Sequence, residues 1–217
     1  MRRALVFITA LAALTPLAAH AEGPEVVGAR ISTLGVGAEF GYRIAPNWSI
    51  RAIANGYNQN YHTTSDNIDY RGELKLGSFG IQADYHLSET NPFYLTVGLY
   101  GNGNKIDATA TPTTTTNIGG VPFTPEQIGT LTGRAKYKST APYLGLGWRW
   151  TTGAVSWNLE AGAYFQGSPN VTLTSNGTYA SNPTYQQALE QERQTLKSDL
   201  DDLKTWPVVA FGVGYHF

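Results

Sequence analysis

The fold is indicated most clearly by the last twelve residues, Trp206-Pro207-Val208-Val209-Ala210-Phe211-Gly212-Val213-Gly214-Tyr215-His216-Phe217. Successive side chains of an extended strand point to opposite faces. One face of this stretch is large and apolar and consists of Val209, Phe211, Val213, Tyr215 and Phe217. The other face is small or polar and consists of Ala210, Gly212, Gly214 and His216. A strand of a closed transmembrane barrel turns such an apolar face to lipid.

Six further segments repeat this two-residue pattern, at about 34–44, 48–55, 70–86, 93–100, 143–150 and 155–166. A bacterial barrel has an even number of strands, so one more is needed. The segment 25–32 is one candidate, paired before a tight reversal near Thr33. The segment 170–178 is the other, although it can also continue the preceding strand. The sequence predicts an all-β, closed antiparallel transmembrane barrel of about eight strands and leaves the eighth open.

Two details of the strands are also predicted. In the first segment the outward, apolar set begins at Leu34. In the segment 70–86 the apolar positions change parity between Leu76 and Phe79. One extra residue near Gly77 and Ser78 would keep both halves facing lipid, so we expect a β-bulge there.

The connections alternate in length and predict the sidedness. The short ones are 45–47, 87–92 and 151–154, and the long ones are 58–69, 105–132 and 167–204. Because outer-membrane barrels have short periplasmic turns and long external loops, we expect the short turns and Phe217 at the periplasmic side. The Thr-rich tract 109–116 is predicted to be a flexible external loop. Thr124-Pro125 predicts one helical turn after it.

The last long connection contains the one helix that the sequence predicts with several signals. Asn182 can cap it, Pro183 suits its first position, and strong helix formers fill 184–204. Its apolar stripe consists of Leu189, Leu196, Leu200 and Leu203. The helix is too short for a partner coiled coil, so the stripe is expected to dock on the barrel rim or on the protein's own loops.

The N-terminal residues predict a secretory signal peptide at 1–21, followed by a barrel domain at 22–217. Arg2 and Arg3 precede an apolar run at 4–14, and Ala19-His20-Ala21 fits the cleavage rule. The absence of Cys excludes disulfides and thiolate metal sites. Charged residues make up 14% of the chain and the net charge is −1, which argues against nucleic acid as a partner.

The inward faces of the predicted strands carry charges of both signs. The members of this set are Glu39, Arg43, Arg51, Glu73, Lys75, Asp84, Arg149 and Glu160. An eight-stranded barrel is only wide enough for its own side chains to fill. We therefore expect the four acidic and four basic groups to pair as a polar plug, with a conducting pore as the alternative.

No catalytic residue, metal site or cofactor is predicted. A lipid A-modifying hydrolase needs a Ser nucleophile with a His base and a carboxylate. His86 and His216 are expected at the periplasmic end, away from the outer leaflet. His62 lies near Ser65 and Asp66, but these are ordinary residues of a polar loop, and no Gly-x-Ser-x-Gly elbow is present. The acidic residues near 190–202 lie on a predicted helix rather than in a ligand-presenting loop.

Several motifs together resemble the small outer-membrane β-barrel superfamily of Gram-negative bacteria, the OmpA, OmpX and OmpW-type porin-like proteins. They are the Ala-x-Ala cleavage pattern, Gly-Ala-Glu-Phe-Gly-Tyr-Arg at 37–43 with the turn at 45–47, and Val-Gly-Tyr-His-Phe at 213–217. Similarity to proteobacterial outer-membrane proteins extends to Ala-Pro-Tyr-Leu-Gly-Leu-Gly-Trp at 141–148, Gln-Gly-Ser-Pro at 166–169 and Trp-Pro-Val-Val at 206–209.

The resemblance implies a location in the bacterial outer membrane, in contact with its lipids and lipopolysaccharide. It also implies that Val213, Tyr215 and Phe217 form the signal read by the barrel-assembly machinery during insertion. The expected role is non-enzymatic, in envelope integrity or surface interaction. A narrow porin-like channel for small solutes is the first alternative, and a lipid A-modifying enzyme is the second.

Overall fold

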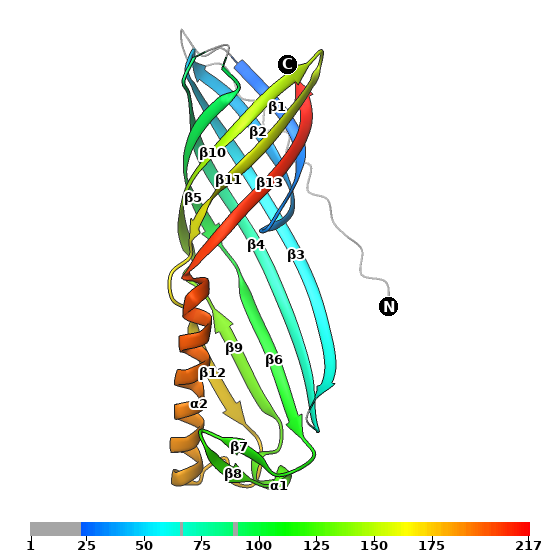
Figure 1. The fold of residues 1–217 in the computed structure, drawn as a ribbon, viewed down its shortest axis with the longest axis vertical. Helices are drawn as coiled ribbons and strands as arrows, with labels where there is room; N and C mark the ends of the chain where they lie inside the picture. Colours follow the sequence, from blue (N-terminus) through cyan, green and yellow to red (C-terminus); the bar gives the residue numbers. More distant parts are fainter. Residues whose placement is uncertain (1–22, 66, 89–90) are drawn as a thin grey trace.

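The computed structural model describes residues 23–65, 67–88 and 91–217, so the predicted signal peptide lies outside the described residues. Eight of the described strands close an antiparallel barrel (Figure 1). In order around the barrel they are β1 (Gly23–Ser32), β2 (Gly35–Ala45), β3 (Trp48–Ser65), β4 (Ile68–His86), β5 (Phe93–Asn102), β10 (Thr140–Thr152), β11 (Val155–Phe165) and β13 (Thr205–His216). Pairing of β13 with β1 closes the ring, which confirms the predicted fold class.

The N-terminal candidate supplies the eighth strand. β1 pairs with β2 across a two-residue reversal in which Ser32 lies opposite Gly35. The Ser32 hydroxyl accepts a hydrogen bond from the Leu34 amide and donates one to the Gly35 carbonyl, both at 3.1 Å. Gly35 has a φ of +111°, which a side chain would disfavour. The reversal turns Leu34 into the lumen, where it is 2% exposed, so the prediction that Leu34 faces outward is wrong.

The outer surface of the barrel is an apolar belt. Large apolar side chains on it that remain exposed include Val27, Ile31, Val36, Phe40, Ile50, Phe79, Ile81, Leu95, Val97, Leu99, Leu144, Trp148, Leu159, Phe211 and Val213. A continuous apolar surface of this extent is far larger than water-soluble monomers expose. In a bilayer the same surface is buried in hydrocarbon, as the alternation along each strand predicts.

The sheet continues beyond one end of the barrel as an open extension (Figure 1). In it β3 and β4 are joined by β6 (Lys105–Pro112), β9 (Leu131–Lys136) and β12 (Asn170–Ser175), in the order β3–β4–β6–β9–β12. The second candidate for the eighth strand is therefore a strand of the extension. The predicted long loop 58–69 is mostly strand, because the hairpin of β3 and β4 pairs well past the barrel rim. The other two long loops contribute β6, β9 and β12 to the extension, together with turns and helices.

The Thr-rich tract is strand at both of its ends, so its prediction as a flexible loop is wrong for those residues. Its first half belongs to β6 and its end begins the short hairpin of β7 (Thr116–Ile118) and β8 (Val121–Phe123). Threonine is β-branched and favours extended backbone, and β4 and β9 provide partners on both sides of β6. The predicted helical turn after the tract is present as α1 (Pro125–Ile128).

The predicted β-bulge near Gly77 and Ser78 is absent. β3 and β4 pair without a register shift from the barrel into the extension, with Gly56 opposite Gly77. The side-chain parity is therefore constant along β4, and Leu74 and Leu76 share the inner face with Gln82. The apolar pattern changes parity because the surroundings change: the outer face meets lipid at Phe79 and solvent further along.

The predicted helix is present as α2 (Pro183–Asp201), which continues into the 3₁₀ turn η1 (Asp202–Lys204) and runs beside β12 (Figure 1). The Asn182 side chain accepts hydrogen bonds from the Thr184 and Tyr185 amides. The N-terminal half of α2 packs into a small core that consists of Ile118, Phe123, Ile128, Tyr185, Ala188 and Leu189. The stripe residue Leu189 thus docks on the protein's own extension. Within the described residues, no helix is long and apolar enough to cross a membrane.

Candidate functional site: the charged lumen

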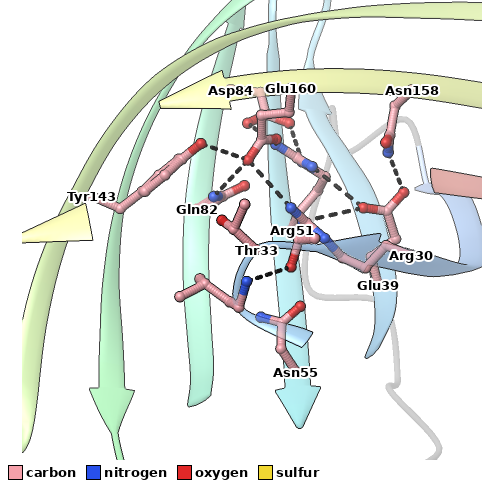
Figure 2. A network of polar contacts seen from close by, with 12 residues as sticks. Arg30, Thr33, Glu39, Arg51, Asn55, Gln82, Asp84, Tyr143, Asn158 and Glu160 are labelled. Carbon is pink, nitrogen blue, oxygen red and sulfur yellow. Dashed lines mark hydrogen bonds and ion pairs between the residues drawn. The ribbon is translucent and has the colours of Figure 1, made fainter. Parts of the chain in front are cut away.

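Charged side chains from several strands meet inside the barrel, and Figure 2 shows Arg51 together with Asp84 and Glu160. The members of this ionic cluster are Arg30 of β1, Glu39 of β2, Arg51 of β3, Asp84 of β4, Arg149 of β10 and Glu160 of β11. All are buried. They converge because each occupies an inward position of its strand, and the closed ring directs these positions to one axis.

Arg51 is the centre of the ionic cluster and is 0% exposed. Its Nε donates to Asp84 Oδ2 at 2.5 Å and its Nη2 donates to Asp84 Oδ1 at 3.0 Å, a bidentate pair. Nη2 also reaches Glu160 Oε2 at 2.6 Å, and Nη1 reaches Glu39 Oε2 at 3.4 Å. The guanidinium carbon lies 5.1 Å from the centre of the Tyr94 ring. One cation therefore links three strands through three carboxylates.

Glu160 is the acceptor that the neutral lumen residues share. Tyr143 Oη donates to its Oε1 at 2.8 Å, and Tyr94 Oη donates to its Oε2 at 3.1 Å. Gln82 Nε2 lies 3.3 Å from Oε1, and Arg30 Nη2 lies 3.5 Å from the same oxygen. A buried carboxylate is stable only when its oxygens accept hydrogen bonds or pair with cations. These four contacts supply such partners to both oxygens of Glu160.

A second charged group lies at the end of the barrel with the short turns. Ser49 Oγ donates to Glu25 Oε2 at 2.6 Å, and Arg43 donates to Glu25 Oε1. Arg149 lies between the two groups, 3.2 Å from Glu25 Oε1 and 3.7 Å from Asp84 Oδ2. A vestibule of about 440 Å³ opens here, lined in part by Glu25, Arg43, Arg149 and His216.

An apolar layer lies on the other side of the ionic cluster, toward the extension. It consists of Leu34, Ile53, Tyr100, Ala141, Tyr143, Tyr164 and Val208. The Tyr100 ring lies 5.9 Å from that of Tyr143 and 5.4 Å from that of Tyr164, both edge-on. The lumen thus changes from charged to apolar along its axis, a change that the alternation of residues along the strands does not predict.

Six of the eight predicted lumen charges point into the barrel or its vestibule. Glu73 and Lys75 do not, and their prediction is wrong. They lie on the extension part of β4, their side chains are 31% and 37% exposed, and they pair with each other at 2.6 Å. Because β4 has no bulge, they share the outer face with Phe79.

Two charged residues of the lumen were missed, Glu25 and Arg30, both on β1. They restore the balance: Glu25, Glu39, Asp84 and Glu160 face Arg30, Arg43, Arg51 and Arg149. For Arg30 the signal is its alternation with Val27 and Ile31, which is informative only once β1 is known to be a barrel strand. Glu25 does not follow this alternation, because the pairing of β1 with β2 shifts register between Pro24 and Val26.

The described histidines lie in two kinds of surroundings, because His86 and His216 both line the vestibule. His62 is on the outer face of the extension, with Nε2 2.7 Å from Asp69 Oδ1. His86 is buried at the vestibule, its ring 5.5 Å from that of Tyr94. Asp66 lies outside the described residues. Within residues 23–65, 67–88 and 91–217, no three His, Asp or Glu side chains are grouped as a metal site.

The proposed assembly residues lie together at the short-turn end of the barrel. Val213 and Tyr215 are exposed on the outer face of β13, and Phe217 follows it. The Tyr215 and Phe217 rings meet edge-on with centroids 5.2 Å apart. This aromatic pair extends the apolar belt to the edge of the barrel at the short-turn end.

A closed eight-stranded antiparallel barrel with an apolar outer belt and a charged lumen defines the class of protein, a transmembrane β-barrel. Among the solved structures that share this fold are two from Acinetobacter baumannii. One is CarO, with a TM-score of 0.61 and 21% identity, and the other is CarO2, with a TM-score of 0.62 and 24% identity. Each alignment covers 89% of this chain and 98% of the other chain. No family model and no curated protein matches the sequence.

Proposed function

We propose that the protein is an integral outer-membrane barrel whose lumen is plugged by its own side chains, with a non-enzymatic role in envelope integrity or surface interaction. The observation that carries this proposal is the complete burial of Arg51 among Glu39, Asp84 and Glu160. A water-filled pore would leave these groups hydrated. The apolar layer around Tyr100 and Tyr164 is a second barrier to ions on the same axis.

Several features support the outer-membrane location and its partners. The belt requires hydrocarbon around the barrel, and barrels of this kind are proteins of bacterial outer membranes. The extension and α2 lie at the end opposite the short turns, and we assign that end to the cell exterior. The partners are then outer-membrane lipids and lipopolysaccharide, together with the barrel-assembly machinery, which would read Val213, Tyr215 and Phe217.

The test is conductance across a planar bilayer. The mature chain is refolded in detergent, and its heat-dependent mobility on a gel shows that the barrel has formed. The expected result is no single-channel step over a range of voltages, at protein amounts for which a known porin gives steps. Stable steps that increase in number with added protein would overturn the plugged lumen.

A narrow channel for small solutes is the second candidate, and the vestibule favours it. The 440 Å³ space admits water and ions as far as Arg149 from the short-turn side. Rearrangement of the ionic cluster and the apolar layer would be needed to continue the path. The same bilayer measurement decides between the two functions.

A further inference from the structure

Three lysines form a row across the outer face of the extension. Lys75 of β4 lies directly opposite Lys105 of β6, and Lys105 lies directly opposite Lys136 of β9. Like charges directly opposite each other destabilise a sheet. A row that crosses three adjacent strands therefore needs anions, either from the protein or from a ligand.

The protein supplies part of this negative charge. Glu73 Oε2 lies 2.6 Å from Lys75 Nζ, and Asp107 Oδ2 lies 3.5 Å from Lys105 Nζ. Hydrogen bonds from basic neighbours lower the pKa of both carboxyl groups, from Lys75 for Glu73 and from Arg134 for Asp107. Both are therefore charged at neutral pH.

The surrounding face remains basic after this pairing. On β4, β6, β9 and the residues that follow β9, the charged members are Arg71, Lys75, Lys105, Arg134, Lys136 and Lys138 against Asp69, Glu73 and Asp107. Six basic and three acidic groups give a net charge of +3, in a chain whose total is −1. Lys136 and Lys138 are exposed. Beside the row is a hollow of about 550 Å³, lined in part by Arg71 and Arg134.

The position of the lysine row relative to the membrane indicates which kind of anionic ligand can reach it. Side-chain parity is constant along β4, so Lys75 and Phe79 point to the same side. They are four positions apart, which is about 13 Å along a strand. Phe79 belongs to the lipid-facing belt, and the row therefore lies at the height where hydrocarbon gives way to head groups.

We propose that this lysine row binds the phosphate groups of an anionic lipid in the outer leaflet, a phosphorylated glycolipid such as lipid A. The inference rests on the proposed function, because it requires the belt to lie in a membrane. The lysines provide point charges for phosphate oxygens, and the lipid's acyl chains lie on the apolar belt below them. Binding removes the repulsion within the row.

The test compares lipid binding by two variants of equal charge change. K105Q/K136Q removes two neighbours of the row, and K197Q/K204Q removes two lysines from α2 and η1 as a matched control. Binding of bisphosphorylated lipid A to each refolded protein is titrated by native mass spectrometry in a nonionic detergent. Lipid A stripped of phosphate is a second ligand, and inorganic phosphate is added as a competitor.

We expect K105Q/K136Q to weaken lipid A binding by about tenfold or more, and the control to change it less than about twofold. The phosphate-free lipid should bind the parent protein as weakly as lipid A binds K105Q/K136Q. Equal binding by both variants, equal binding of both lipids, or displacement of lipid A by millimolar inorganic phosphate would each overturn the inference. Insertion into neutral vesicles is measured separately, so failure there contradicts the membrane location itself.

Discussion

Replacement of Arg51 by methionine tests the ionic cluster at its centre. The side chain is 0% exposed and makes four hydrogen bonds to three carboxylates. R51M retains the apolar stem but leaves Glu39, Asp84 and Glu160 facing only Arg30 and Arg149. Each charge-assisted bond is worth about 1.5–3 kcal/mol, but desolvation of the guanidinium offsets much of their sum. We expect a net loss of about 3–5 kcal/mol, typical of a buried pair that loses one partner.

The assay is urea unfolding in short-chain phosphatidylcholine vesicles, followed by tryptophan fluorescence. The matched control is R134M, because Arg134 also pairs with a carboxylate, Asp107 at 2.5 Å, but is 61% exposed. Such a surface pair is worth about 0–1 kcal/mol. The double variant R51M/D84N should be more stable than R51M, since it removes one unpaired carboxylate. Equal losses for R51M and R134M, or no recovery in the double variant, would refute this reasoning.

Two further predictions concern the lipid belt and the extension. L159R places a charge on the lipid face and should lower the free energy of unfolding by about 2–4 kcal/mol in the same assay. T114R, at an exposed turn of the extension, should leave the free energy of unfolding nearly unchanged. Equal losses of stability in the two variants would contradict the assigned faces. L189A opens a gap in the small core under α2 and should destabilise the extension by about 2–5 kcal/mol without loss of the folded barrel. Hydrogen exchange measures this locally, and the idea of a separately stabilised extension fails if β10 and β11 lose protection in parallel with α2.

The strands could be predicted because the membrane imposes one simple rule on each of them. Every barrel strand must present an apolar side chain at every second position, and this pattern is visible without knowledge of its partners. This rule no longer applies where a strand leaves the membrane, because its outer face then meets solvent instead of lipid. At Leu74 and Leu76 the apolar residues face inward and the outer face is polar. A rule that places every apolar side chain on the lipid face therefore predicts a β-bulge that is absent. Glu73 and Lys75 were assigned to the lumen by the same error.

The lumen could be predicted only in part. Arg51, Asp84 and Glu160 occupy inward positions of strands with clear alternation, and their convergence follows from closure of the ring. Arg30 was missed because the membership of β1 was undecided, and Glu25 was missed because a register shift between Pro24 and Val26 places it on the inner face. The apolar layer was missed because Tyr100, Tyr143 and Tyr164 look like ordinary inward residues until three strands bring their rings together.

The closed barrel, the lipid-facing side of most barrel strands and the helix near the C-terminus can be predicted from the amino-acid sequence alone. These features are local: they depend on alternation, turns and caps that each segment carries alone. The folded structure is needed to establish which charges meet, which lysines align across β4, β6 and β9, and how the extension continues the sheet. Those features depend on strand register and ring closure, which join residues as far apart as Arg30 and Glu160. No single segment of the chain contains that information.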